Sequence, residues 1–101
     1  MIMFVRSSEF DAWLSGLTDQ KAKARVLARL RSATLGNFGD CDSVGEGVSE
    51  MRIHAGPGYR VYFTRTGATV YFLLTGGDKS TQKRDIARAK DMARELKETN
   101  P

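Results

Sequence analysis

Two arginines, the only histidine and two tyrosines lie around one predicted turn, in the sequence EMRIHAGPGYRVYF at residues 50–63, and four of these side chains share one face of the predicted hairpin. In chain order these side chains are Arg52, His54, Arg60 and Tyr62. A guanidinium binds phosphate well, an imidazole can move protons near neutral pH, and a phenol ring can stack on an unpaired base. Taken singly, each residue is more typical of the polar face of a hairpin than of a site. Together they form a cationic, aromatic cluster that could bind or cut RNA, and the pattern alone leaves both interpretations open.

The register of the hairpin follows from matching its apolar faces. A three-residue loop at residues 56–58 sets Ile53 opposite Val61, so that the apolar side chains of both strands share one face. A four-residue loop would shift the register by one residue and put Ile53 on the face of Arg60. On the polar face, the three-residue loop predicts the pairs His54 with Arg60, Arg52 with Tyr62, and Glu50 with Thr64.

A second hairpin extends this polar face. A two-residue turn at Thr66-Gly67 pairs Phe63 with Val70 and brings Tyr71 beside Tyr62. One face of the sheet is then apolar and covered by helices, while the other carries two arginines and two tyrosines. Arginine on phosphate and tyrosine on bases is a combination typical of RNA binding.

More polar residues are expected near the tip of the first hairpin. Asp78-Lys79 lies just past the end of the third hairpin strand, and Ser80 and Thr81 open the last helix. The free N–H groups at that helix end could hold a phosphate. Lys83 and Arg84 add positive charge to the same turn of helix.

The elements that position these residues follow from apolar periodicity and capping signals. The pattern predicts a buried strand at 1–5, a short helix around 10–17, a helix at 20–34, a loop at 37–47, strands at 48–55, 59–65 and 68–75, and a last helix at 80–97. The β-α-α-β-β-β-α order predicts a single α+β domain over residues 1–101, a sandwich with a mostly antiparallel sheet and helices on one face.

Charge and cysteine content narrow the class of protein. The formal net charge is +4, which makes a polyanion or an acidic protein a plausible partner. Residues 20–35 hold five Lys or Arg and no acid, and we interpret Lys21, Arg25 and Arg29 as a solvated helix face. The single cysteine, Cys41, excludes an intrachain disulfide, suits a reducing compartment and is more typical of a bystander than of a nucleophile. We expect a cytoplasmic protein without membrane span, metal or cofactor.

Two segments carry a family resemblance: GNFGDCDSVGEGVSEMRIHAGPGYRVYF and LLTGGDKSTQKRDIARA. They resemble the addiction-module killer proteins, a HigB-like branch of the RelE/ParE toxin superfamily. The similarity covers nearly the whole chain, including FDAWLSGLTDQKAKARVLARL near the start, and its most specific parts are GPGYRVYF and GGDKSTQ. The element order above agrees with the RelE-like fold that this resemblance implies.

The resemblance also implies a function. A relative of this kind is the toxin of a type II toxin–antitoxin pair, a metal-independent endoribonuclease that cuts mRNA on the ribosome. Its partner is a helix-turn-helix antitoxin from the same operon, and a toxin–antitoxin heterotetramer is one assembly consistent with this. Other members of the superfamily inhibit DNA gyrase and cleave nothing, which is the alternative function. A nucleic-acid-binding module without an antitoxin is a third.

The roles of functional residues in RelE-like toxins can be transferred to this chain only in part. Arg60 matches the arginine that follows Gly-Tyr in RelE-like toxins and is assigned to the scissile phosphate, and Arg52 corresponds only roughly to a second phosphate clamp. Lys79 occupies a position after the last strand where ribonuclease members carry a basic or catalytic residue. Several relatives place a catalytic Tyr or His there, and DKSTQKRDI has neither. Glu50 and His54 are proposed by proximity alone, so the identity of the general acid and base stays open.

The candidate catalytic residues are Arg60, Arg52, Lys79 and His54, and the candidate RNA contacts are Tyr62, Tyr71, Ser80, Thr81, Lys83 and Arg84.

Overall fold

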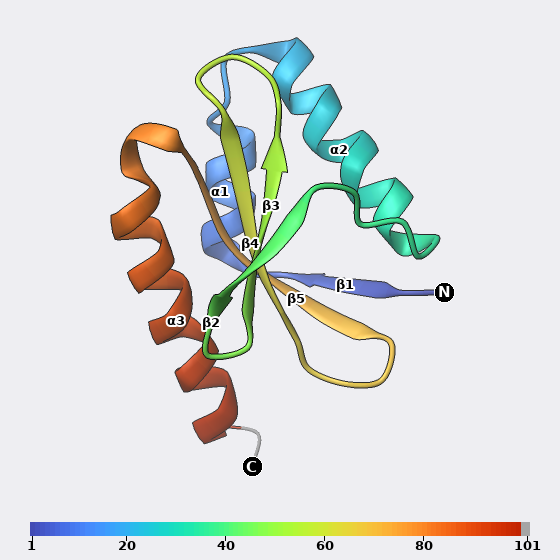
Figure 1. The fold of residues 1–101 in the computed structure, drawn as a ribbon, viewed down its shortest axis with the longest axis vertical. Coiled ribbons are helices and arrows are strands. Elements are labelled where there is room, and N and C mark those ends of the chain that lie inside the picture. The colour runs from blue at the N-terminus through green and yellow to red at the C-terminus, as the bar shows by residue number, and fades with distance from the viewer. Residues whose placement is uncertain (100–101) are drawn as a thin grey trace.

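A five-stranded mixed sheet organises the chain in the computed structural model, which describes residues 1–99 (Figure 1). The elements are β1 (Met3–Arg6), α1 (Ser8–Ser15), α2 (Gln20–Thr34), β2 (Cys41–Gly45), β3 (Val48–Ile53), β4 (Tyr59–Arg65), β5 (Val70–Asp78), a 3-10 turn (Lys79–Thr81) and α3 (Gln82–Thr99). The strand order is β1-β5-β4-β3-β2, with β1 parallel to β5 and the other pairs antiparallel. The predicted α+β class and mostly antiparallel sheet are confirmed. Residues 100–101 of the predicted single domain lie outside the described part.

The first two helices form where local signals predict them. Ser7 caps α1, because its hydroxyl accepts a hydrogen bond from the Phe10 N–H at 2.8 Å. Asp19 caps α2 in the same way, and α2 has the predicted bounds. The predicted inner stripe of α2 is buried in full, at Ala22, Val26, Leu30 and Ala33. Both helices pack on one face of the sheet, over a core that includes Met51, Ile53, Val61 and Phe63.

The last helix packs on the opposite face of the sheet. Ala89 and Ala93 of α3 share a second core with Val48, Tyr62 and Leu74, and Figure 1 shows α3 across the sheet from α2. The prediction that all helices lie on one face is therefore wrong. The physical reason is that β3, β4 and β5 each carry apolar side chains on both faces, so that each face needs a helix to cover it.

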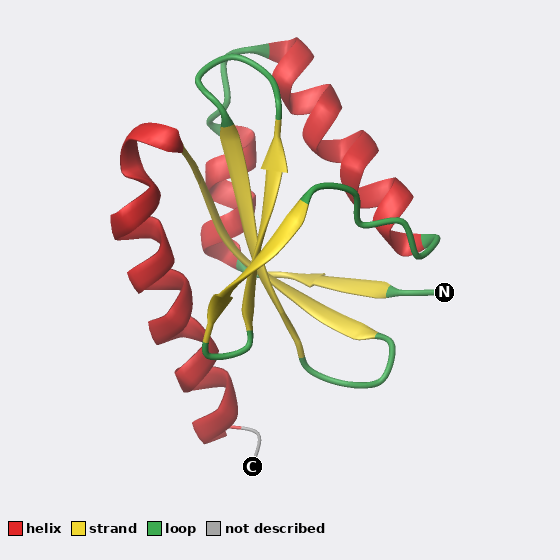
Figure 2. Cartoon of the chain, viewed as in Figure 1, coloured by secondary structure: helices red, strands yellow, loops and turns green. Residues whose placement is uncertain are grey.

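One strand was predicted as a loop. The Gly-, Asp- and Ser-rich segment contains β2, which pairs antiparallel with β3 along its free edge. Its local sequence is a poor strand former, and the pairing with β3 decides its conformation. Figure 2 shows this strand at the edge of the strongly twisted sheet.

The β3–β4 register differs from the predicted one by two residues. Arg52 lies opposite Arg60, and Glu50 lies opposite Tyr62. The loop therefore spans five residues, His54 to Gly58, with positive φ angles at Gly56 and Gly58. Because the shift is even, every side chain keeps its predicted face.

The β4–β5 register differs more. A bulge between Tyr62 and Phe63 leaves Leu74 as an extra residue, and Tyr71 lies opposite Arg65 instead of beside Tyr62. The strand also continues through Gly76 and Gly77, which were predicted to end it. Trp13 and Asp85 lie so close to these glycines that a side chain at either position would collide with them. Within residues 1–99, no helix combines the length and hydrophobicity needed to cross a membrane.

Candidate functional site

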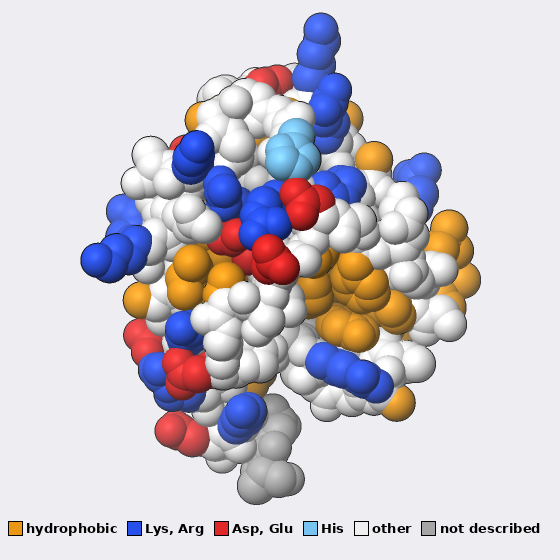
Figure 3. Space-filling view, in the orientation of Figure 1, with side chains coloured by type: hydrophobic (Ala, Val, Ile, Leu, Met, Phe, Trp, Pro, Cys, Tyr) orange, Lys and Arg blue, Asp and Glu red, His pale blue; other side chains and the backbone are white. Residues whose placement is uncertain are grey.

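A cleft of about 340 Å³ lies at the end of the β3–β4 hairpin. The four side chains predicted as catalytic all line it, namely Arg52, His54, Arg60 and Lys79. The remaining lining comes mainly from the hairpin loop, with Gly56, Pro57 and Gly58. In Figure 3 the single histidine adjoins a group of basic and acidic side chains on the face shown. The structure thus brings the predicted catalytic set together.

A buried carboxylate, that of Glu50, organises the floor of this region. Its Oε2 accepts hydrogen bonds from the Tyr62 hydroxyl at 3.1 Å and from Gln82 Nε2 at 2.8 Å. The same oxygen lies 3.4 Å from Arg60 Nε, and Oε1 lies 3.5 Å from Arg52 Nε. A buried charge is stable only when it is paired and hydrogen-bonded, and these four groups meet that requirement.

Arg60 is held rigidly but keeps one donor group free. Only 12% of its side chain is exposed, and Nη1 donates to the Gly58 carbonyl at 3.0 Å. Nε is buried beside Glu50 without a well-aligned hydrogen bond. Among the residues that the structure describes, Nη2 has no hydrogen-bond partner. An anion in the cleft could therefore bind to it without displacing an existing contact.

Arg52 is surrounded by carboxylates. Nη1 lies 2.8 Å from Asp40 Oδ1, and Nη2 lies 2.5 Å from Asp42 Oδ2. Hydrogen bonds to Asp42 and then Asp40 raise the pKa of Arg52 above its usual value. Three acids, counting Glu50, thus offset its charge, and Arg52 is less available to an incoming phosphate than a second clamp would need to be.

His54 and Asp40 form a hydrogen-bonded pair at the mouth of the cleft. His54 Nε2 lies 2.7 Å from Asp40 Oδ2, while 74% of the histidine side chain is exposed. The hydrogen bond from His54, together with Arg52, holds the pKa of Asp40 below its usual value. The ionised carboxylate of Asp40 can accept a hydrogen bond from Nε2 only when Nε2 carries a proton. In a neutral imidazole ring, Nδ1 is then the nitrogen without a proton.

Two arginines of α2 hold the main chain around the cleft. Arg29 donates to the carbonyls of Phe38 at 2.9 Å and Asp40 at 3.4 Å, and also to that of Arg52. Arg25 donates to the carbonyl of His54 at 2.9 Å. The prediction of a solvated helix face is therefore wrong for Arg29, which is half-buried and bridges α2 to β3 and the loop before β2. Arg25 is exposed as predicted, although it also bonds to the hairpin loop.

The predicted phosphate site at the last helix is already occupied by a side chain. Asp78 Oδ1 accepts hydrogen bonds from the Ser80 N–H at 2.8 Å and the Ser80 hydroxyl at 2.5 Å. These bonds to Ser80 lower the pKa of Asp78. The Thr81 hydroxyl donates to Asp85 at 2.5 Å. Neither hydroxyl is therefore poised for a phosphate as predicted.

A separate hollow of about 520 Å³ contains the remaining helix candidates. Ser80, Thr81, Lys83 and Arg84 line it, together with Ala87. Lys79 lines the cleft and directly precedes Ser80, which lines this hollow. Within residues 1–99, neither Lys79 nor Lys83 forms an ion pair or a side-chain hydrogen bond. Their charges are therefore available to an anionic ligand.

The two tyrosines are not on an open surface. Tyr62 is 0% exposed beneath α3, and burial followed by the nearby Glu50 charge raises the pKa of its phenol. Tyr71 packs on the other face of the sheet, with its ring centroid 5.2 Å from that of Phe38 and 5.9 Å from that of Phe63. The prediction that both rings are exposed beside Arg60 is wrong, because of α3 in one case and the β5 bulge in the other.

Asp40, Asp42 and Gln82 contact the site but were not among the residues predicted from the sequence. The alternating acids of the segment DCD were a usable signal, because they lie at the spacing of a strand that faces Arg52. Gln82 gave no such signal, since its contact with Glu50 depends on where α3 packs. Cys41 is half-buried, and burial raises the pKa of its thiol, which agrees with a bystander role. In residues 1–99, no three His, Cys, Asp or Glu side chains form a group that could hold a metal ion.

Two comparisons with known proteins span most of the chain. Residues 12–98 match the family model described as "Phage derived protein Gp49-like (DUF891)". The chain is also similar to a protein of Haemophilus influenzae (strain ATCC 51907 / DSM 11121 / KW20 / Rd) described as "Uncharacterized protein". The two are 51% identical over 87 residues, which cover 86% of this chain and 88% of the relative. The family match includes every residue that lines the cleft.

Proposed function

We propose that this chain, which belongs to the Gp49-like family of phage-derived proteins, is the toxin of a type II toxin–antitoxin pair. We further propose that it is an endoribonuclease that cuts mRNA on the ribosome. The family supports the first statement, because Gp49-like proteins are toxin-like proteins of addiction modules. The observation that carries the second is the cleft in which Arg52, His54, Arg60 and Lys79 meet.

Metal-free cleavage of RNA makes three demands on a site. The 2′-hydroxyl attacks the adjacent phosphorus and loses its proton to a base, the phosphate accumulates charge, and the departing 5′-oxygen takes up a proton. A 2′,3′-cyclic phosphate and a free 5′-hydroxyl result. The cleft offers one imidazole and several cations for these tasks.

His54 is the candidate base. Asp40 holds its Nε2 at 2.7 Å, so Nδ1 is the nitrogen that can take the 2′-hydroxyl proton. Arg52 contributes by positioning, since it fixes Asp40 at 2.8 Å through Nη1. This role differs from the phosphate clamp that the family resemblance implied, and it follows from the three carboxylates around Arg52.

Arg60 and Lys79 are the candidate side chains for binding the phosphate and stabilising its charge. The free Nη2 of Arg60 can bind a non-bridging oxygen, and Glu50 with the Gly58 carbonyl holds the guanidinium still. A preorganised cation stabilises developing charge better than a mobile one, because it needs no rearrangement during the reaction. Lys79 has no internal partner among the described residues, and its ammonium group can both stabilise the departing 5′-oxygen and donate the proton that this oxygen takes up.

Primer extension on ribosome-bound mRNA tests the proposal. Wild-type protein should produce new RNA 5′ ends within translated codons, and Arg60→Lys and His54→Ala should each reduce cleavage at least about a hundredfold, as is typical when one acid–base or charge-stabilising group is lost. Arg31→Lys is the matched control, because Arg31 is exposed on α2 and its side chain forms no bond within residues 1–99. Circular dichroism should show that all variants are folded.

Two outcomes would count against the enzyme. Full cleavage by the Arg60 and His54 variants would remove these residues from the mechanism. Intact mRNA together with DNA damage and filamentation would indicate gyrase inhibition instead. Within residues 1–99, Arg25 and Arg29 of α2 donate to main-chain carbonyls, and these bonds leave less of the basic face of α2 free for a protein target such as gyrase.

A further inference from the structure

The two faces of the sheet are covered unequally. Within residues 1–99, the two helices α1 and α2 pack on one face, whereas α3 alone packs on the other. Strands lie about 4.8 Å apart and packed helices about 8–10 Å apart, so one helix covers roughly two strands. A five-stranded face therefore has room for a second helix beside α3.

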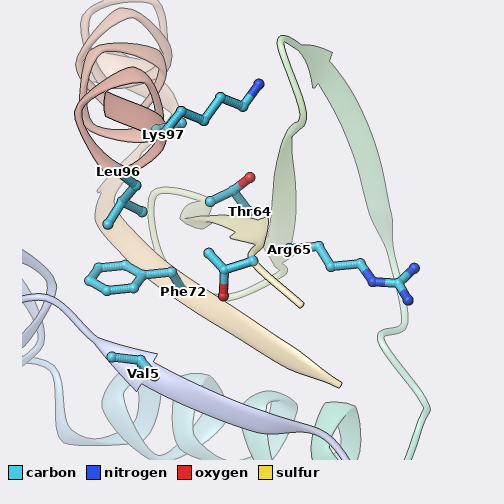
Figure 4. Close-up of a pocket in the computed structure, with 8 residues that line it drawn as sticks. Val5, Thr64, Arg65, Phe72, Leu96 and Lys97 are labelled. Carbon is cyan, nitrogen blue, oxygen red and sulfur yellow. The ribbon is translucent and has the colours of Figure 1, made fainter. Parts of the chain in front are cut away.

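The uncovered part of this face is a groove of about 470 Å³. Phe72 of β5 and Leu96 of α3 form its apolar floor, and Val5 of the edge strand β1 continues it. Figure 4 shows Val5, Phe72 and Leu96 near one another, with Lys97 on the same helix as Leu96, Thr64 on the facing strand, and the Arg65 side chain extending away from Phe72 and Leu96. An adjoining hollow shares Phe72 and Leu96, adds Leu74 and Met92, and carries one acid, Glu95. The apolar surface thus extends along the C-terminal half of α3.

The charges beside the main groove are positive. Arg65 donates to the carbonyls of Gly67 at 2.8 Å and Ala68 at 2.9 Å, and these neutral groups leave its charge uncompensated. Lys97 forms no ion pair with any acid in residues 1–99. Among residues 1–99, no acidic residue lines this groove. The hydrogen bond from an arginine of α3 and, to a smaller extent, the charge of Lys97 lower the pKa of Glu46, but the lining of the groove itself is positive. An apolar floor with a positive lining complements an amphipathic helix with acids along its edges.

We propose that this groove receives an acidic amphipathic helix of a protein partner, which packs beside α3 as the missing second helix of this face. On the proposed function that partner is the antitoxin. Its apolar residues, spaced at i, i+3, i+4 and i+7, cover Phe72 and Leu96, and its acids pair with Arg65 and Lys97. The groove and the RNA cleft are separate surfaces with no lining residue in common.

Two synthetic peptides about four helical turns long test this proposal. Both carry leucine at the spacing above, and the remaining positions are mainly Glu in one and mainly Lys in the other. Fluorescence anisotropy should show saturable binding of the acidic peptide to the full chain and much weaker binding of the basic one. Lys97→Glu and Arg65→Glu should each weaken the acidic peptide about tenfold, which corresponds to about 1.4 kcal/mol. Arg31→Glu, an equal charge reversal on exposed α2 surface, should leave the affinity unchanged.

Each other outcome overturns the proposal. Failure of the acidic peptide to bind, equal binding of both peptides, or equal affinity in the groove and control variants would exclude this helix site. A change in the protein's own sedimentation on Lys97→Glu, without peptide binding, would assign the groove to a second copy of the chain. Growth arrest on expression of the chain separates these results from failure of the proposed function. On the proposed function, growth arrest requires Arg60 but not Lys97, so it should persist in Lys97→Glu even if the helix site is excluded.

Discussion

The Glu50 carboxylate and the Arg60 guanidinium lie 3.4 Å apart, with 2% and 12% of their side chains exposed. By contrast, Arg6 and Asp11 lie 2.6 Å apart, but close to half of each side chain is exposed. Solvent screens the shorter pair and not the longer one. Burial therefore decides which of the two contributes to the conformational specificity of the fold.

A double-mutant cycle should reveal this difference. Glu50→Gln and Arg60→Ala should each lower the free energy of unfolding. The double variant should lose clearly less unfolding free energy than the sum of the two single losses, with a coupling free energy of about 1–3 kcal/mol. Glu50→Gln leaves the buried Arg60 without its carboxylate, and Arg60→Ala leaves the buried Glu50 with one cation fewer, whereas the double variant removes both charges of the pair. Urea unfolding provides the free energies. The same cycle on Arg6 and Asp11 should give less than about 1 kcal/mol, and a larger coupling at the surface pair than at the buried pair would contradict the prediction.

Replacing Arg29 should loosen the cleft although Arg29 is not itself one of the residues that line it. Arg29→Met removes the donor from the carbonyls of Phe38, Asp40 and Arg52. Loss of these bonds should lower the free energy of unfolding by about 1–3 kcal/mol and speed amide exchange in the loop at residues 37–40. Arg31→Met, two positions along the same helix, should stay within about 0.5 kcal/mol of wild type. Equal effects of the two substitutions would show that the carbonyl contacts are unimportant.

Ionised Asp40 should stabilise the cleft, and this stabilisation should be lost at low pH. Its pKa is lowered in the folded protein, first by the hydrogen bond from His54 and then by Arg52. Its contribution to stability is therefore complete above the ordinary aspartate pKa, about 4, and is lost as the pH falls through the lowered value. A carbon-13 titration should place the Asp40 midpoint below that of a free aspartate, and His54→Ala should move it upward. An unchanged midpoint in this variant would mean that His54 does not hold the carboxylate.

The features predicted correctly are those determined by nearby residues. The Asp19 cap and the four-residue stripe from Ala22 to Ala33 fix α2 without reference to the rest of the chain. The alternation of Met51 and Ile53 with Arg52 fixes which side chains share a face, and this held even though the register was wrong by two residues. Local patterns therefore gathered the four cleft candidates correctly.

The features predicted wrongly depend on contacts between distant segments. The strand β2 exists because β3 offers a free edge, and the bulge at Leu74 serves a core that only α3 completes. Tyr62 is indistinguishable in sequence from an exposed strand tyrosine, and its burial follows from the position of α3 alone. Asp40 joins the site only through β2 pairing and Arg29. The RelE-like topology implied by the resemblance stays a prediction.

Tyr62 should make the protein sensitive to alkaline pH. Burial, and then the charge of Glu50, raise the pKa of its phenol above that of a free tyrosine. Below about pH 10 the folded and unfolded chains are both protonated at this site, and above it the unfolded chain ionises first. Stability should therefore fall as the pH rises beyond about 10. Tyr62→Phe removes this contribution, so its unfolding free energy should fall less steeply than that of wild type, and parallel pH profiles would contradict the assignment.

Gly77 should be intolerant of the smallest possible side chain. A Cβ at this position would collide with the Asp85 carboxylate, which is itself fixed by the Thr81 hydroxyl at 2.5 Å. Because Asp85 is buried and short, it cannot swing aside, and Gly77→Ala should cost about 1–3 kcal/mol of unfolding free energy. Gly67→Ala is the matched control, since its new methyl group would meet only Val70 at 3.7 Å, an ordinary contact. Urea unfolding of both variants separates the collision from the general effect of replacing glycine, and equal stabilities would show that α3 can shift away from β5.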